Sequence, residues 1–148
     1  MNFLKQFADN LQSGDGLLIG VDLVKDSAIL EAAYDDADGI TAAFNTNLLH
    51  RIDRELDANI NSSSFNHRAI FNRDKSRIEM HLVSDDQQLV HIADNEFLFE
   101  KGETIHTENS YKYTVDSFSE LAKRAGFLLD KVWTDDDNLF SVNYFSVV

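Results

Sequence analysis

Residues 16–22 read Gly-Leu-Leu-Ile-Gly-Val-Asp, a short apolar run in which apolar and polar residues do not alternate. Such a run is typical of a strand that is buried on both faces of an α/β sheet. The turn-forming residues Ser13-Gly14-Asp15 precede it, and Asp22 ends it. Because ligands of open α/β sheets gather at the carboxyl ends of strands, we expect residues 22–26 to lie at the rim of a binding site.

Helical patterns flank this strand on both sides. Upstream, the apolar residues Phe3, Leu4, Phe7 and Leu11 recur at helical spacing. Downstream, residues 115–125 carry a second apolar stripe, with Thr114 as the expected amino-terminal cap and Gly126 as the expected end. Residues 127–133 and 139–147 are β-prone runs separated by an acidic turn, which predicts a terminal hairpin.

The middle of the chain begins with two predicted helices. The first runs from Ser27, a candidate cap, to Ala33, and the chain then breaks near Asp38-Gly39. The second begins at Thr41 and carries apolar residues four apart, which make one apolar stripe. The residues of this stripe are Phe44, Leu48, Ile52 and Leu56.

Several short strands follow these helices. Residues 69–71 and 77–83 predict two strands joined by a turn, and residues 89–92 and 97–99 are expected to continue the meander. Helices followed by antiparallel strands suit an α+β unit better than repeated βαβ crossings. The residues therefore predict an α/β framework interrupted by an α+β insertion.

Composition excludes several classes of function. The chain has 148 residues, of which 43% are hydrophobic, so it can bury a real core. Acidic residues outnumber basic ones 26 to 13, which argues against nucleic-acid binding. The chain has no cysteine, so thiol catalysis, disulfides and thiolate zinc sites are excluded. No apolar stretch is long enough to span a membrane and no secretory signal is evident, so we expect a soluble, cytoplasmic protein.

Familiar site motifs do not fit this sequence. Gly14-Asp-Gly16 precedes a strand, whereas a nucleotide-binding turn follows one. Asp35-Asp-Ala-Asp-Gly39 lacks the ligand spacing of a calcium loop. The 5 histidines lack the spacing of a catalytic zinc site, and Asp135-Asp-Asp137 reads as a solvated turn. No metal is therefore expected, and the residues by themselves leave the function open.

Three stretches, in order along the chain, carry a resemblance to a known family. The first comprises Gly20-Val-Asp-Leu-Val-Lys-Asp26, Ala33-Tyr-Asp-Asp-Ala-Asp-Gly-Ile-Thr-Ala-Ala-Phe-Asn45 and Arg54-Glu-Leu-Asp57. The second is Arg77-Ile-Glu-Met-His-Leu82, and the third is Ile105-His-Thr-Glu-Asn-Ser110. They resemble the histidine-specific, S-adenosylmethionine (SAM)-dependent methyltransferases, which convert histidine to its trimethylated betaine on the ergothioneine route. The resemblance covers nearly the whole chain.

The resemblance implies an α/β fold, namely the carboxyl-terminal part of a Rossmann-like methyltransferase sheet with an inserted α+β substrate domain. Residues 1–23 would supply a helix and the fifth strand of the sheet. Residues 24–112 would form the inserted substrate-binding domain. Residues 113–148 would complete the Rossmann part with a helix and a terminal hairpin. The amino-terminal strands of the sheet would lie upstream of this chain.

The resemblance also implies which residues line the substrate pocket: Tyr34, Met80, Glu108 and Ser110. Glu108 can accept a hydrogen bond from an imidazole N–H, and Met80 offers a polarizable contact to the ring. Tyr34 would bind the polar end of the amino acid. Judged from the residues alone, Met80 would be core and Glu108 a solvated surface acid. No catalytic, cofactor-binding or metal-binding residue is assigned.

The implied function is the substrate-binding part of an enzyme that methylates the α-amino group of histidine or a related amino acid. SAM would be held mostly by upstream residues, so the chain alone should be inactive. The alternative is a non-catalytic module of the same fold that binds an amino acid or a protein. In either case strand 16–22 would have an open edge, which we expect another copy or the amino-terminal half to cover.

Overall fold

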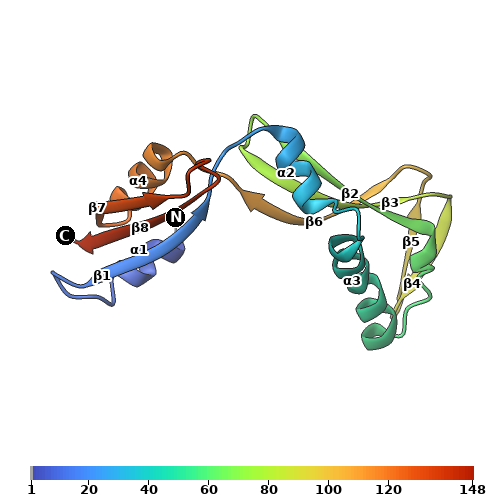
Figure 1. Ribbon diagram of the computed structural model, residues 1–148. Helices are drawn as coiled ribbons and strands as arrows, with labels where there is room; N and C mark the ends of the chain where they lie inside the picture. The colour runs from blue at the N-terminus through green and yellow to red at the C-terminus, as the bar shows by residue number, and fades with distance from the viewer. Residues whose placement is uncertain (1) are drawn as a thin grey trace. The chain divides into compact units, whose positions relative to one another are not determined.

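The computed structural model describes the chain from residue 2 to residue 148 and divides it into two compact units (Figure 1). Unit 1 consists of the chain up to Lys25 together with Tyr111–Val148, and unit 2 consists of Asp26–Ser110. Both units combine helices and sheets, so the mixed α/β class is confirmed. The assignment of the three predicted ranges to Rossmann and substrate domains stays a prediction. Within the described residues, no helix is long and apolar enough to cross a membrane.

Unit 1 is built around a three-stranded antiparallel sheet with the order β1-β8-β7. Its strands are β1 (Gly16–Asp22), β7 (Phe127–Thr134) and β8 (Phe140–Val147), and its helices are α1 (Asn2–Ala8) and α4 (Val115–Lys123). The register of β1 on β8 runs from Gly16↔Ser146 to Asp22↔Phe140. The terminal hairpin and the cap at Thr114 are confirmed, since the Thr114 hydroxyl accepts from the Ser117 amide.

Strand β1 is not buried on both faces, so that expectation is wrong. Leu17, Ile19 and Val21 pack into the core of unit 1, whereas the alternate residue Leu18 is 63% exposed. The reason is that the described residues cover only one face of β1 and pair only one of its edges. An uninterrupted apolar run predicts a strand, but it does not say which of its faces the rest of the chain covers.

The two glycines of β1 make room for aromatic rings of β8. A Cβ atom at Gly16 would lie 2.5 Å from the Tyr144 side chain, and one at Gly20 would lie 2.7 Å from the Phe140 ring. Each ring belongs to the residue diagonal to the glycine in the β1–β8 register. These contacts explain why β1 contains glycine at positions where a strand normally prefers larger residues.

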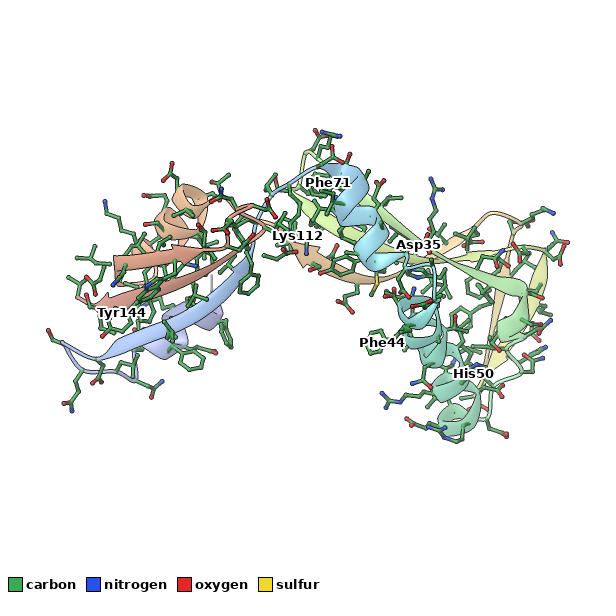
Figure 2. All side chains as sticks on the ribbon, in the orientation of Figure 1. Asp35, Phe44, His50, Phe71, Lys112 and Tyr144 are labelled. Carbon is green, nitrogen blue, oxygen red and sulfur yellow. The ribbon has the colours of Figure 1, made fainter. Side chains whose placement is uncertain are left out.

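A buried ion pair joins the two sequence segments of unit 1. The Lys112 side chain, labelled in Figure 2, is fully buried, and its Nζ lies 2.8 Å from Oδ2 of Asp22. Lys25 contributes a second ammonium 2.6 Å from Oδ1 of Asp22. Burial opposes ionisation of Asp22, but the hydrogen bonds from Lys112 and Lys25 outweigh it and hold the pKa of that carboxyl below its usual 3.8. Next to this pair, Val24 N–H donates to the Tyr113 carbonyl at 2.9 Å.

Replacing Asp22 with Asn should lower the free energy of unfolding by about 3 kcal/mol at pH 7, because it leaves the Lys112 ammonium buried without its carboxylate. The folded-state pKa is the lower one, so the ionised pair stabilises the protein above pH 3.8 and its contribution is lost as the pH falls through the folded-state value. Urea denaturation measures the change. Asp130→Asn, at an exposed carboxyl on β7, is the control, and equal stability of the two variants would contradict this role.

Unit 2 packs two helices on a three-stranded sheet. The helices are α2 (Ser27–Tyr34) and α3 (Ile40–Leu56), followed by a short 3₁₀ turn, η1 (Ser62–Ser64). The sheet has the order β2-β3-β6, from β2 (Phe65–Asn72), β3 (Arg77–Ser84) and β6 (Thr104–Tyr111). Strands β4 (Gln88–Ile92) and β5 (Asn95–Phe99) form a separate two-stranded sheet. The predicted continuous meander is therefore wrong, and β6 takes the place beside β3.

The cap of α2 and the buried residues of α3 are not the residues that the sequence pattern singles out. The cap of α2 is Asp26 rather than Ser27, because its carboxylate accepts from the Ala28 amide at 2.8 Å. In α3 the buried residues are Asn45 and Leu49. The apolar stripe lies one residue earlier and is largely exposed, with Phe44 at 67% and Leu56 at 50%. Leu49 instead packs with Phe65 of β2 and Leu82 of β3.

Candidate functional site

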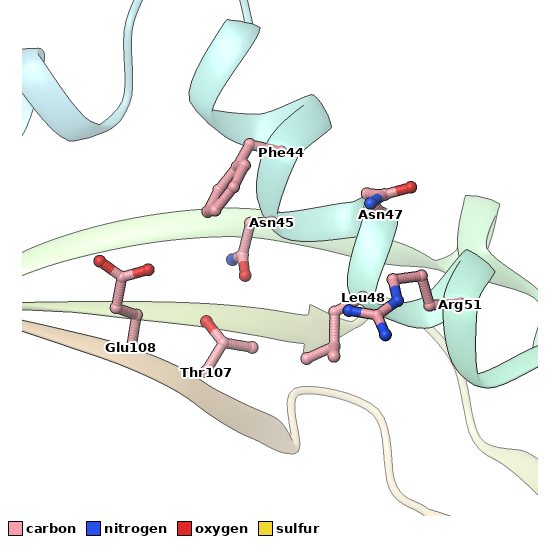
Figure 3. Close-up of a pocket in the computed structure, with 7 residues that line it drawn as sticks. All are labelled: Phe44, Asn45, Asn47, Leu48, Arg51, Thr107 and Glu108. Carbon is pink, nitrogen blue, oxygen red and sulfur yellow. The ribbon is translucent and has the colours of Figure 1, made fainter.

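A surface pocket of about 220 Å³ lies in unit 2 between α3 and β6 (Figure 3). Helix α3 supplies most of its wall and β6 supplies the opposite side. The lining residues are Phe44, Asn45, Asn47, Leu48, Arg51, Thr107 and Glu108. Since α3 presents its apolar stripe toward solvent, Phe44 and Leu48 are available to a ligand here rather than to the core.

The chemistry of the pocket is divided between its two sides. Phe44 and Leu48 form an apolar wall, and Glu108 presents an exposed carboxylate opposite them (Figure 3). Arg51 is engaged by Glu55, with Nε 3.2 Å from Oε1 of that carboxylate. An apolar wall facing a carboxylate suits a small molecule that has a flat or apolar part and an N–H donor.

A chain of hydrogen bonds ties the pocket to the rest of unit 2. The amide nitrogen of Asn45 lies 2.9 Å from Nδ1 of His67, and Nε2 of His67 lies 2.7 Å from the Tyr34 carbonyl. A carbonyl only accepts, so Nε2 of the neutral ring carries the hydrogen and Nδ1 accepts from Asn45. The Tyr34 hydroxyl in turn lies 2.7 Å from the Ser110 hydroxyl. This network connects α2, α3, β2 and β6.

The four predicted pocket residues fall in three places. Glu108 lines the pocket. Tyr34 and Ser110 bond to each other. Met80 is 3% exposed in the core cluster with Leu30, against which Tyr34 also packs. The Met80 backbone still reaches the site, because its carbonyl accepts from the Thr107 hydroxyl at 3.0 Å. Their joint role in binding a substrate stays a prediction.

Sequence reasoning missed most of the lining. It placed Phe44 and Leu48 in an apolar stripe and gave no role to Asn45, Arg51 or Thr107. A usable signal existed, because Phe44 and Asn45 belong to the first stretch that resembles the family and Thr107 precedes Glu108 in the third. Asn45 is a polar residue next to the apolar stripe. Its amide is buried and needs a hydrogen-bond partner, and that partner comes from another element of the fold, which the sequence pattern does not show.

His67→Ala should lower the free energy of unfolding by about 2 kcal/mol, because it removes two hydrogen bonds and leaves the buried Asn45 amide without its ring partner. Chemical denaturation followed by circular dichroism measures this change. The matched control is His50→Ala, at an exposed histidine of α3, which should change stability by less than about 0.5 kcal/mol. Equal effects of the two substitutions would show that the network does not hold the helices in place.

Comparison with known proteins adds to this geometry. The family model "Histidine-specific methyltransferase, SAM-dependent" matches residues 1–147. A histidine N-alpha-methyltransferase of Mycolicibacterium smegmatis is 43% identical over 143 residues, which is 95% of this chain and 44% of that protein. The Mycobacterium tuberculosis protein of the same name is 40% identical over the same shares. A fission-yeast protein, ergothioneine biosynthesis protein 1 of Schizosaccharomyces pombe, is 24% identical over 86% of this chain and 17% of its own length.

A solved methyltransferase of Streptomyces caelestis aligns with 98% of this chain and 51% of its own at 10% identity. Its TM-score of 0.36 is too low to indicate a common fold. The chain spans less than half the length of the two bacterial relatives it matches. The family match nevertheless extends over both units. The chain thus belongs to the family of histidine-specific, SAM-dependent methyltransferases.

Proposed function

We propose that this chain supplies the acceptor side of a SAM-dependent methyltransferase acting on the α-amino group of histidine or a related amino acid. The observation that carries the proposal is the pocket between α3 and β6, where Glu108 faces the apolar residues Phe44 and Leu48. Family membership supports the reaction class, and the names of the bacterial relatives support histidine as the acceptor.

The pocket chemistry matches an imidazole. The Glu108 carboxylate can accept the ring N–H while Phe44 and Leu48 pack on the ring itself. Ser110 follows two residues along β6, roughly 6.6 Å further on, and bonds to Tyr34, so this pair can meet polar groups at the other end of the amino acid. Met80 would contribute indirectly, because it belongs to the buried cluster against which Tyr34 packs.

Methyl transfer requires the acceptor amine to be neutral and its lone pair to be aimed at the methyl carbon. Holding the amino acid by its ring and its polar end would limit its orientations, which is the main contribution that positioning residues make. SAM, when bound by the complete enzyme, would supply the methyl group, and the residues of this chain would hold the acceptor nitrogen in position to receive it. No covalent intermediate with a protein side chain is involved.

SAM is the cofactor of the family. The residues of this chain do not fit its binding, because the only Gly-X-Gly turn, at residues 14–16, precedes β1, whereas a cofactor-binding turn follows a strand. We therefore place most of the SAM contacts in the part of the relatives that this chain does not span. The chain alone would bind the acceptor without transferring a methyl group.

Glu108→Gln should weaken histidine binding by about tenfold, because the imidazole N–H loses a charged acceptor while the side-chain shape is kept. Calorimetry with histidine, with phenylalanine as a ligand lacking the ring N–H, measures the change. Glu120→Gln, at an exposed glutamate of α4 in unit 1, is the matched control and should bind histidine as the wild type does.

Unchanged histidine affinity in Glu108→Gln and in Glu108→Ala would overturn the pocket assignment. Tight SAM binding by this chain alone would contradict the division of the site between two parts. The enzyme can be distinguished from a non-catalytic binding module by joining this chain to the part of the relatives that it does not span. Only the enzyme would then produce methylated histidine.

We also propose that the open edge of β1 is covered by another strand, from a second copy or from the remainder of the enzyme. An unpaired edge presents backbone N–H and C=O groups to any partner strand, and Leu18 adds an exposed apolar side chain there. The three-stranded sheet of unit 1 gives β1 one partner, β8, among the described residues.

Sedimentation at increasing concentration should show self-association of the isolated chain, and Leu18→Lys should weaken it, because a charge on an edge strand opposes pairing. Leu98→Lys, at an exposed leucine of β5 in unit 2, should leave it unchanged. A wild-type chain that stays monomeric at high concentration would rule out the second copy as the covering strand.

A further inference from the structure

The face of β3 that points away from the helices carries two ionisable residues. Ile78, Met80 and Leu82 pack into the two core clusters of unit 2, which also contain Leu30 of α2 and Leu49 of α3. Side chains of a strand alternate between its two faces, so Glu79 and His81 lie on the opposite face. They are therefore separated from the Met80 layer that underlies Tyr34.

His106 joins this pair from the neighbouring strand. Its ring stacks on His81 with the centroids 4.6 Å apart and the planes 25° apart. Glu79, His81 and His106 each offer a ligand atom, and these three atoms all lie within 4.8 Å of one another. The shortest approach between Glu79 and His81 is 3.6 Å, from Oε2 to Nε2.

Each of the two histidines has a ring nitrogen that can act as a ligand atom. Nδ1 and Nε2 of His81 are both buried and have no hydrogen-bond partner among the described residues, an unusual condition for a buried ring. Nε2 of His106 lies 3.1 Å from the Glu108 carbonyl, and since that oxygen only accepts, Nε2 is the donor and Nδ1 is the nitrogen that can act as a ligand atom.

The carboxylate is oriented by its neighbours. Arg77 Nε donates to Oε1 of Glu79 at 2.8 Å, and the Asn72 amide donates to the same oxygen at 3.1 Å. Oε2 is the oxygen that faces His81. Support of ligands by hydrogen bonds to their other atoms, seen here for both Glu79 and His106, is the usual arrangement around bound metals.

We propose that Glu79, His81 and His106 bind a divalent transition-metal ion of the zinc class. Two imidazoles and one carboxylate are a ligand set that zinc accepts, with a fourth position left to water. Ligand atoms around a tetrahedral zinc ion lie roughly 3.4 Å apart, so the distances between these three ligand atoms need to shorten by about 1 Å. His106 is exposed and can make that movement. The bound ion would join β3 to β6, the strand that carries Glu108.

The spacing of histidines along the chain did not predict this site, because its ligands come from neighbouring strands rather than from one helix. Positions 79 and 81 are separated by one residue on β3, and position 106 is brought beside them only by the pairing of β3 with β6. The site depends on different side chains from the acceptor pocket, so it can be tested apart from the proposed function.

The test is a zinc titration of the metal-free chain in competition with a chromogenic chelator. The wild type should bind one ion per chain, and His106→Ala and His81→Ala should each weaken binding by at least about tenfold. Zinc should raise the melting temperature of the wild type and not that of His106→Ala. Cobalt(II) should give a visible d–d spectrum that His106→Ala abolishes.

His50→Ala is the matched control, because His50 is an exposed histidine of unit 2 on α3 (Figure 2), and it should bind zinc as the wild type does. His106→Ala is the decisive variant since an exposed side chain can be removed without opening the core, which circular dichroism verifies. The proposed site would be wrong if His106→Ala bound zinc as tightly as the wild type does. It would also be wrong if His50→Ala lost as much zinc affinity as His106→Ala.

Discussion

The ion pair between Asp22 and Lys112 is the buried electrostatic constraint between the two sequence segments of unit 1. A fully buried ammonium needs a counter-charge, and Asp22 provides it at the point where β1 ends. The same place is where the chain leaves unit 1 after Lys25 and re-enters it at Tyr111. Within unit 1 the pair therefore holds Lys112 beside the carboxyl end of β1, where the β1–β8 register ends at Asp22↔Phe140.

Unit 2 shows how a binding surface can be made from a helix whose apolar stripe is left outside the core. Asn45, rather than the apolar stripe, points into the core of unit 2. Its side-chain amide donates a hydrogen bond to His67, and the same ring donates to the Tyr34 carbonyl. Phe44 and Leu48 consequently face Glu108 across a pocket. The polar network fixes the orientation of α3, and that orientation makes apolar side chains available to a ligand.

Sequence patterns predicted the elements of this fold better than they predicted burial. The runs at residues 16–22 and 115–125 became a strand and a capped helix, because both depend on local spacing and local turns. The stripe from Phe44 to Leu56 is not the buried face of α3, and periodicity could not show this, because it ranks residues by apolarity and does not include a partner such as His67 for Asn45. The pairing of β3 with β6 also could not be predicted from the sequence, because β4 and β5 lie between them along the chain.

Glu108 was reachable from the sequence only through the family resemblance, since an isolated acid in an acidic chain has no distinguishing pattern. The central claim is that this chain holds the acceptor amino acid at Glu108 and Phe44. Nuclear magnetic resonance of the isotope-labelled chain, titrated with histidine, tests it most directly. We expect shifts of the Phe44, Asn45, Thr107 and Glu108 amides with little change in unit 1. Shifts confined to unit 1, or no shifts at all, would contradict it.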